Sequence, residues 1–253
     1  MHKSFKIIMK KTLIWRDIRM KNERFLRTEM LLGEASIEKL ASKKVAVFGL
    51  GGVGSYAAEA VARCGVGCME IIDNDRVSIT NINRQLCALD STVGRFKTEV
   101  VSERIKDINP DIKIFERCEF FIPDNADSFD FASYDFVIDA IDTVSAKIEI
   151  AKRCSALGIP MISCMGTGNK LDPSQLKVSD LAKTSGCPLA RVMRRELKAI
   201  GITHLPVIYS EEKPIEPKTE CAEGGKRTVG SVAFVPSVAG LLAASEAIKK
   251  LIE

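Results

Sequence analysis

The sequence predicts an α/β protein with a Rossmann-like, mostly parallel sheet and helices on both of its faces. Short apolar runs rich in Val, Ile and Phe alternate with helical stretches along much of the chain, which is typical of parallel sheets. The first run opens into a glycine cluster at residues 49–54, which indicates a tight turn from strand to helix. The chain has 253 residues, 46% of them apolar, and is long enough to bury the core of one large domain.

The elements up to residue 165 alternate regularly. Residues 45–48 are β-branched and aromatic and predict a buried strand, whereas the alanine-rich stretch after the glycines predicts a helix. Pro110 ends a later helix, because proline cannot continue one. Short helical segments at 24–27 and 34–40 precede the first strand. The predicted strands are 45–48, 69–72, 112–115, 135–139 and 160–164, and the predicted helices are 53–64, 95–108, 125–131 and 143–157.

Beyond Gly166 the regular alternation gives way to a small C-terminal part of strands and helices. A charged segment rich in Pro and Gly, residues 210–230, is long enough to indicate a functional or disordered loop. The apolar segment 232–248 contains polar residues and falls short of a membrane span, so we expect a buried strand and helix there, with a membrane anchor as the alternative. The predicted strands are 176–179, 207–209 and 232–235, and the predicted helices are 188–200 and 237–252.

Composition and cysteine usage indicate an ordinary cytoplasmic protein. The formal net charge of +4 is compatible with a polyanionic partner but does not single one out. Eight cysteines are scattered over the chain without a CxxC pair, which favours a reducing compartment and predicts no zinc. Residues 1–23 are basic, and the apolar runs in them do not exceed three residues. We expect a loosely attached, partly disordered extension there rather than a secretory signal.

The glycine cluster has the spacing of a dinucleotide-binding turn. Gly49 would permit the tight turn, Gly51 would let the backbone approach a phosphate, and Gly54 would let the helix pack on the strand. A phosphate at the helix N-terminus is favoured by free N–H groups and by the helix dipole. The next strand ends at Asp73, at the distance expected for a ribose-binding carboxylate. For the glycines alone, a turn without a ligand is the alternative.

Charged side chains follow two of the predicted strands, at the sheet edge where such folds bind ligands. The loop after the second strand carries Asp73, Asp75, Asn83 and Arg84, and Lys97 begins the helix after that loop. Asp139 and Asp142 come at the end of the fourth strand. Each of these residues alone also fits a helix cap or a surface ion pair, whereas together they indicate a nucleotide site with cations for the phosphates.

At this point the chain resembles the ubiquitin-activating-enzyme-like adenylating proteins, the ThiF/MoeB/HesA type, which include adenylating enzymes of molybdopterin and thiamin biosynthesis. The resemblance covers about residues 24–165 and rests on five motifs in the order and spacing of that family. They are RxxR at 24–27, GxGGVG at 49–54, DxDxVxxxNxNRQ at 73–85, GxxK at 94–97 and DxxD at 139–142. The resemblance implies one adenylating domain, residues 24–253, with a nucleotide-binding core at 24–165 and a part for substrate binding and dimerisation at 166–253.

The resemblance also implies a role for each matching residue. Asp73 matches the ribose-binding carboxylate, Arg84 and Lys97 match the cations on the triphosphate, and Asp142 matches the carboxylate that holds Mg²⁺. Arg27 matches an arginine that reaches into the site of the neighbouring subunit, which implies a catalytic homodimer. The catalytic residues would be Arg27, Arg84, Lys97 and Asp142. The ATP-binding residues would be Gly49, Gly51, Gly52, Gly54, Asp73, Asp75, Asn83, Arg84, Lys97 and Asp142.

Two features separate this chain from relatives that charge a sulfur-carrier protein. The CxxC zinc pairs common in those relatives are absent, and Cys187 and Cys221 are the only cysteines of the later half placed in loops that could line the site. Either could be an inert thiol, and a persulfide role with a sulfur-transfer partner stays open for Cys221. The segments 183–197 and 230–240 are instead similar to one branch, the tRNA threonylcarbamoyladenosine dehydratases, although that branch often has Asp where Cys187 stands.

Helix 188–200 gives a second indication of tRNA as a partner. One of its faces is apolar, and another carries the cations Arg191, Arg194, Arg195 and Lys198 at helical spacing. Such a stripe suits a phosphate backbone, although a solvated helix face is the alternative. The branch resemblance implies ATP-dependent cyclising dehydration of threonylcarbamoyladenosine in tRNA through an acyl-adenylate. The rival functions are adenylation of the C-terminal glycine of a ubiquitin-like sulfur carrier, a nicotinamide oxidoreductase, and a nucleotide-binding module without turnover.

Overall fold

The computed structural model describes residues 23–219, 222–223, 226–227 and 229–253. Its core is a seven-stranded sheet in the order β3-β2-β1-β4-β5-β7-β6, in which β6 is antiparallel to β7 and every other pair is parallel. The predicted Rossmann-like fold is confirmed. The strands are β1 Lys44–Phe48, β2 Cys68–Ile72, β3 Lys113–Arg117, β4 Phe136–Asp139, β5 Met161–Cys164, β6 Leu176–Asp180 and β7 Pro206–Ser210. A separate two-stranded ribbon pairs β8 (Ala222–Glu223) with β9 (Lys226–Arg227) inside the predicted loop 210–230.

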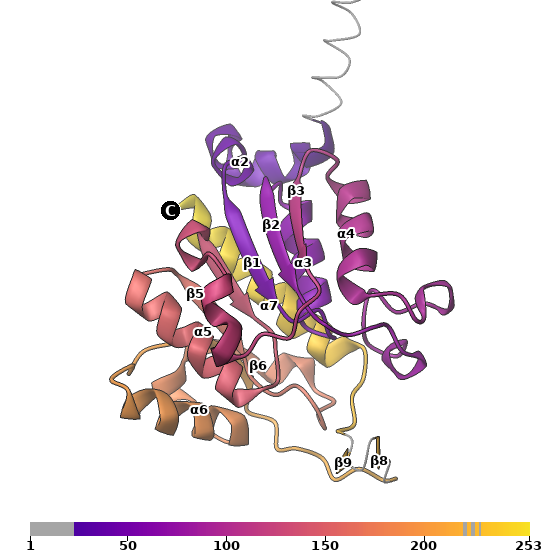
Figure 1. Ribbon diagram of the computed structural model, residues 1–253, viewed down its shortest axis with the longest axis vertical. Helices are drawn as coiled ribbons and strands as arrows, with labels where there is room; N and C mark the ends of the chain where they lie inside the picture. Colours follow the sequence, from indigo (N-terminus) through magenta and orange to yellow (C-terminus); the bar gives the residue numbers. More distant parts are fainter. Residues whose placement is uncertain (1–22, 220–221, 224–225, 228) are drawn as a thin grey trace, which may run out of the picture.

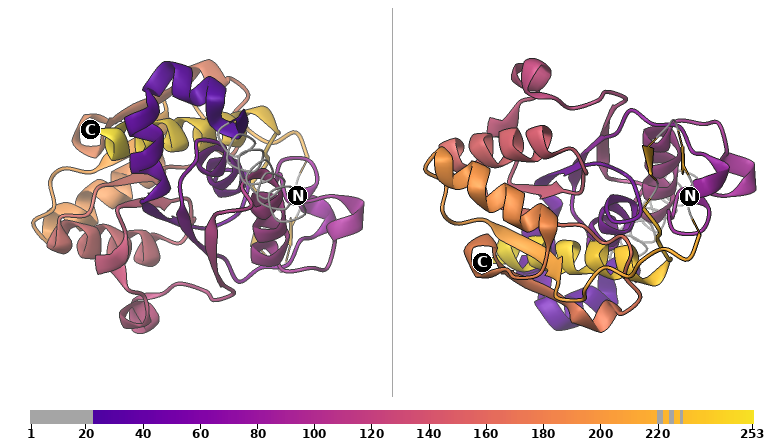
Figure 2. Two further views of the ribbon diagram at one scale, coloured as in Figure 1. Left: turned by 90° about the horizontal axis from the view of Figure 1, so that it is seen from above. Right: turned by 90° about the horizontal axis from the view of Figure 1, so that it is seen from below.

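Helices cover both faces of the sheet (Figures 1 and 2). One core cluster packs α3, α4 and α7 on one face, and a second packs α5 and α6 on the other. In β1, Val45 and Val47 belong to the first cluster and Ala46 and Phe48 to the second, as the two-residue period of a strand requires. The helices are α2 Glu34–Ala41, α3 Gly54–Arg63, α4 Lys97–Ile108, α5 Val144–Leu157, α6 Pro188–Ala199 and α7 Phe234–Ile252, after a further helix at residues 23–32.

Helix α7 crosses the start of α3 very closely. A Cβ atom added at Gly240 would lie 2.3 Å from the carbonyl oxygen of Val53 and 3.0 Å from Cβ of Tyr56. One turn earlier, Pro236 packs against Gly52, where an added Cβ would meet the proline ring at 3.1 Å. The C-terminal helix therefore closes over the glycine cluster. None of the described helices combines the length and the apolar character that crossing a membrane requires.

Two predicted elements are wrong. The helix expected at 125–131 is a pair of 3₁₀ turns at Pro123–Ser128 and Phe131–Ser133, because the Asn125 side chain accepts from the Ile122 N–H and donates to the Phe120 carbonyl, in competition with helical bonds. The strand expected at 232–235 is absent, since α7 already begins at Phe234. A short apolar run cannot distinguish a buried strand from a buried helix, and Pro236 falls in the first turn, where its missing N–H costs nothing.

The predicted N-terminal extension, residues 1–23, lies outside the described residues except for Glu23. The division of residues 24–253 into a core at 24–165 and a C-terminal part at 166–253 stays a prediction. The described sheet runs through both parts, because β5 pairs with β7 and β7 pairs with β6.

Candidate active site

The glycine cluster lies at the point where the strand order reverses. β1 and β4 are parallel neighbours, so their carboxyl ends place Gly49 beside Ala140. Gly49 has a φ of +88° and an added Cβ there would lie 2.8 Å from the Ala140 carbonyl oxygen. An added Cβ at Gly54 would lie 1.7 Å from the Gly49 carbonyl oxygen. Neither position can therefore hold a side chain, and sheets of this kind bind ligands at this reversal point.

Gly51 differs from these two glycines because a Cβ atom there would make only an ordinary van der Waals contact. The nearest heavy atom to an added Cβ is Nε2 of Gln85, at 3.9 Å. The carbonyl of Gly51 accepts bonds from the N–H and the hydroxyl of Ser55 in the first turn of α3. The backbone around Gly51 is thus fixed at the helix N-terminus without a side chain above it, as phosphate binding requires.

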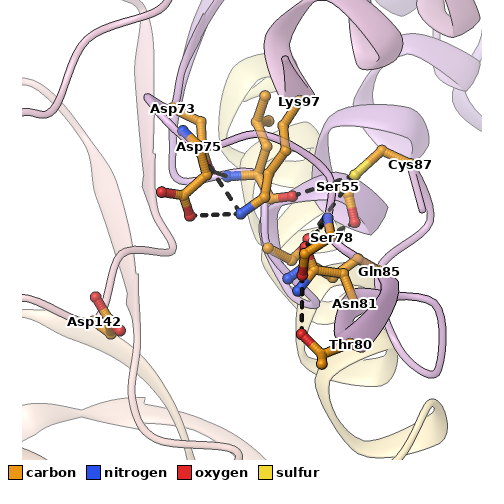
Figure 3. A network of polar contacts seen from close by, with 12 residues as sticks. Ser55, Asp73, Asp75, Ser78, Thr80, Asn81, Gln85, Cys87, Lys97 and Asp142 are labelled. Atoms are coloured by element: carbon orange, nitrogen blue, oxygen red, sulfur yellow. Dashed lines mark hydrogen bonds and ion pairs between the residues drawn. The ribbon is translucent and has the colours of Figure 1, made fainter. Parts of the chain in front are cut away.

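Asp73, Asp75 and Lys97 form a connected network at the same edge (Figure 3). Asp73 accepts from the Leu50 N–H at 2.6 Å and from the Asp75 N–H at 2.8 Å, so it links the glycine turn to the loop after β2. Burial raises the pKa of the Asp73 carboxyl above its ordinary value, against the opposing effects of Lys97 and the two N–H donors. Nζ of Lys97 lies 2.7 Å from Oδ2 of Asp75 and 3.8 Å from Oδ1 of Asp73.

Arg84 lies next to Gly52 of the glycine cluster, and Asn83 precedes it in the loop after β2. Arg84 donates from Nη1 to the Thr80 carbonyl at 2.8 Å and to Oδ1 of Asn83 at 2.9 Å. Its Cγ would lie 3.5 Å from a Cβ at Gly52. Asn83 donates in turn to the carbonyl of Ser231, which precedes α7. The guanidinium is therefore positioned by its own loop rather than by a pair with Asp75.

Asp142 lies across from the Asp73, Asp75 and Lys97 network in Figure 3. Its carboxylate is exposed and accepts a hydrogen bond from the Thr143 hydroxyl at 3.4 Å. Within the described residues, no group of three or more His, Cys, Asp or Glu side chains could hold a metal ion. A single carboxylate that shares an ion with phosphates and water is what Mg²⁺ takes in nucleotide sites, so the residues present fit that ion.

The comparisons with known proteins identify the family. The sequence profile of the ThiF family matches residues 25–253. The chain belongs to the ThiF family. The tRNA threonylcarbamoyladenosine dehydratase of Bacillus subtilis is 41% identical over 240 residues, which are 90% of this chain and 94% of that protein. A crystal structure of the Escherichia coli tRNA N6-threonylcarbamoyladenosine dehydratase in complex with ATP has a TM-score of 0.84 and 37% identity, with 91% of this chain and 94% of that chain covered. The predicted resemblance to this family is confirmed.

One buried residue, Lys147, was missed in the sequence, and so was the pairing of Asp139 with it. Lys147 of α5 and Asp139 of β4 form an ion pair beneath the Asp142 loop. Asp139 was noticed only as half of an acidic pair. Lys147 had a usable signal, because it stands on the face of α5 that also carries the buried residues Ile150, Ala151 and Cys154. A lysine on an apolar helical face requires a partner in the core.

Other predicted residues of the ThiF-family chain lie outside this cluster. Arg27 is exposed and lines a groove with Leu241 and Ser245 of α7. In the cation stripe of α6, Arg194 donates from Nε and Nη2 to the main-chain carbonyls of Leu181 and Thr184. These bonds tie part of the Arg194 guanidinium to the loop before α6, and its predicted contact with RNA is untested. Arg191, Arg195 and Lys198 are exposed, and their predicted role is untested.

The cysteines of the ThiF-family chain are buried or unactivated in its described part. Burial raises the pKa of the Cys87 thiol to about 11 and that of Cys154 and Cys164 to about 12. The pKa values of Cys64, Cys68 and Cys118 are raised by burial as well. Cys187 is buried at the N-cap of α6. Raised pKa values make thiols poor nucleophiles. The other candidate, Cys221, lies outside the described residues.

Proposed function

We propose that this protein catalyses the ATP-dependent cyclising dehydration of threonylcarbamoyladenosine in tRNA. The observation that carries the proposal is the meeting, at one reversal point of the sheet, of the glycine turn at Gly51, the ammonium group of Lys97 and the exposed carboxylate of Asp142. The similarity to dehydratases over nearly the whole chain supports it. A nicotinamide oxidoreductase would give no role to Lys97 or Asp142.

In this reaction the carboxylate of the threonylcarbamoyl group attacks the α-phosphorus of ATP, and pyrophosphate leaves. The carbamoyl group of the same nucleoside then closes on the activated carbonyl and expels AMP, with the net loss of one water. The N-terminus of α3 would bind phosphate, Asp73 would bind ribose, and Lys97 and Arg84 would stabilise the charge that develops on the phosphates. Asp142 would hold Mg²⁺, which neutralises phosphate charge when bound. No protein nucleophile is required, in agreement with the unactivated thiols.

A homodimer in which Arg27 completes the site of the partner is part of the proposal. The helix at 23–32 exposes Leu26, Met30 and Leu31 by 46%, 78% and 87%, and a groove of about 560 Å³ separates it from α3 and α7. Apolar exposure of this kind is typical of interaction surfaces. Arg27 lines this groove together with Ser245. Ser245 comes nine residues after Pro236, which corresponds to about 13 Å along α7. Arg27 is thus remote from the glycine cluster of its own subunit.

The tRNA partner and the cytoplasmic setting belong to the same proposal. The exposed cations Arg191, Arg195 and Lys198 on α6 would contact the phosphate backbone. Free thiols at all the described cysteines favour a reducing compartment. The expected absence of zinc stays a prediction from the missing CxxC pairs.

Adenylation of a ubiquitin-like sulfur carrier is the second candidate function. It would use the same nucleotide site and would require a partner with a Gly-Gly tail. A sulfur-transfer step would also need a reactive thiol, and the cysteines in the described part of the chain are buried or have raised pKa values. The adenylation itself needs no thiol, so only the sulfur-transfer step would depend on Cys221.

Mass spectrometry of nucleosides tests the proposal directly. Threonylcarbamoyl-modified tRNA is incubated with the protein, ATP and Mg²⁺, and the modified nucleoside should lose the mass of one water. The Asp142→Ala variant and a reaction without ATP are the controls, and both should leave the nucleoside unchanged. If the wild-type protein leaves the nucleoside unchanged and catalyses pyrophosphate exchange only when a Gly-Gly-tailed carrier is added, the result supports the sulfur-carrier function instead.

A further inference from the structure

Two fully buried charges lie beneath the loop that carries Asp142. Lys147 and Asp139 both have a side-chain exposure of 0%, and Nζ of Lys147 lies 2.9 Å from Oδ2 of Asp139. A buried ion pair is often no more stabilising than apolar residues of the same volume, so its presence is weak evidence for a stability role. The contacts of this pair indicate a different role.

The pair binds the main chain on both sides of one residue, Ile141. Lys147 donates to the carbonyl of Ile141 at 3.0 Å and to the carbonyl of Cys164 at 2.8 Å. Asp139 accepts from the N–H of Ile141 at 3.3 Å and from the Ser163 hydroxyl at 2.5 Å. All three ammonium hydrogens and both carboxylate oxygens are therefore used, and the carboxyl ends of β4 and β5 are joined at Ile141.

Ile141 connects the pair to the active site. Its side chain packs against the glycine turn, with Cγ2 lying 3.0 Å from the position of a Cβ at Gly49. The next residue is Asp142, whose exposed carboxylate accepts one long hydrogen bond within the described part of the chain, from the Thr143 hydroxyl at 3.4 Å. Because few side-chain contacts orient Asp142, its placement depends on the main chain at Ile141, which the buried pair holds.

We propose that the Lys147–Asp139 pair is a positioning device that holds Ile141 and thereby places Asp142 for magnesium binding. The inference rests on the proposed function, in which Asp142 holds the ion. Lys147 and Asp139 are positioning residues, since both side chains are fully buried. Residues that orient a metal ligand typically change metal affinity 10- to 100-fold when replaced.

Mg²⁺ should increase the affinity for ATP, and the test measures the Mg²⁺ concentration at which half of this increase is reached. The affinities are measured by calorimetric titration without tRNA. Lys147→Met should raise this concentration about tenfold and leave the affinity for ATP without Mg²⁺ close to that of the wild type. Lys147→Met combined with Asp139→Asn should do the same without leaving an unpaired buried charge. The control is Lys170→Met, which removes another buried lysine, one that donates to the carbonyls of Ser210 and Glu212, and should not change the Mg²⁺ response.

A double-mutant cycle separates the inference from the proposed function. In the Asp142→Ala background, Lys147→Met should have no further effect on the Mg²⁺ response, because both changes act through one carboxylate. If Lys147→Met and its combination with Asp139→Asn fold and show a wild-type Mg²⁺ response, the inference is overturned and the proposed function is not affected. The same holds if Lys147→Met keeps its full effect in the Asp142→Ala background. A wild-type response of Asp142→Ala itself would refute the magnesium role in the proposed function. If both charge variants fail to fold, Ser163→Ala decides, with a smaller shift in the same direction expected.

Discussion

Nζ of Lys97 lies 2.7 Å from Oδ2 of Asp75, although Lys97 is the first residue of α4. The N-terminus of a helix carries partial positive charge, so an ammonium group is unfavourable there by itself. The carboxylates of Asp75 and Asp73 offset this cost and hold the ammonium at the sheet edge with a side-chain exposure of 5%. The positive charge is therefore fixed in place before a nucleotide binds.

Replacement of Lys97 should weaken ATP binding while the fold is kept. A hydrogen bond from an ammonium to a phosphate contributes about 1.5–3 kcal/mol, so Lys97→Met should raise the Kd for ATP about 10- to 100-fold in calorimetric titrations. Lys106→Met on the same helix is the control, because Lys106 is exposed and lies 3.6 Å from Glu116. An unchanged Kd for folded Lys97→Met would exclude a phosphate contact.

The glycines of the turn should separate into two classes. Gly51→Ala should leave the free energy of unfolding within about 0.5 kcal/mol of wild type, because the added methyl group would clash with no atom, but it should weaken ATP binding. Gly54→Ala should destabilise the fold by several kcal/mol, about 3 or more, since its Cβ would overlap the Gly49 carbonyl. Urea unfolding and ATP titration of both variants measure the contrast. Equal effects of the two substitutions on unfolding would contradict it.

The catalytic dimer should show complementation between inactive variants. Arg27→Ala and Asp142→Ala should each abolish dehydration, whereas an equal mixture after subunit exchange should recover about a quarter of wild-type activity, because half of the dimers are mixed and each of these has one intact site. Nucleoside mass spectrometry measures the recovery. Mixing without any recovery would count against the role of Arg27 across the interface.

The exposed cations of α6 should control tRNA affinity. Arg191→Ala combined with Arg195→Ala should weaken tRNA binding and reduce the slope of its salt dependence by about two, without changing ATP affinity. Lys106→Ala with Lys113→Ala, at the other end of the sheet, removes the same charge and serves as the control. Arg194→Ala should instead lower stability, because three bonds to Leu181 and Thr184 are lost. Identical salt slopes for the two double variants would refute this role of the helix.

Alkaline pH should destabilise the fold through its buried thiols. Burial raises the pKa of Cys154 to about 12, whereas the thiol of an unfolded chain ionises at about 8.5. Above the lower value the unfolded state releases a proton that the folded state keeps, so the free energy of unfolding falls as pH rises. Between about pH 8 and pH 10 the Cys154→Ala variant should lose about 2 kcal/mol less than wild type. Urea unfolding under reducing conditions measures both slopes, and parallel slopes would contradict the expectation.

The sequence predicted the parts of this site that depend on local spacing. Gly49, Gly54, Asp73 and Lys97 lie within short motifs whose strand and helix neighbours have clear periodicity, and β1 to β5 lie within two residues of their expected bounds. What it could not predict depends on contacts between distant segments. Arg194 stood at a correct helical position, but its partners lie on the preceding loop.

The start of α7 and the pairing of Lys147 were missed for related reasons. Phe234 and Val235 fit a buried strand as well as a buried helix, and only packing on α3 decides between them. Lys147 stands on the buried face of its helix, but its partners could not be identified until the register of β4 and β5 brought Asp139 and Ser163 together. Local pattern therefore predicted the elements, and tertiary packing determined their ends and the supporting residues.

The closure of α7 over the glycine turn has a consequence for synthesis of the chain. The turn at residues 49–54 is made early, but Pro236 and Gly240, which pack against Gly52 and Val53, belong to the last helix. Protein chains fold from the N-terminus as they are made, and this contact joins Gly52 and Val53 to Pro236 and Gly240, which are made much later. The nucleotide turn therefore stays incompletely packed until the start of α7 has left the ribosome. A premature stop before Pro236 would thus yield a chain with every nucleotide motif and no finished site.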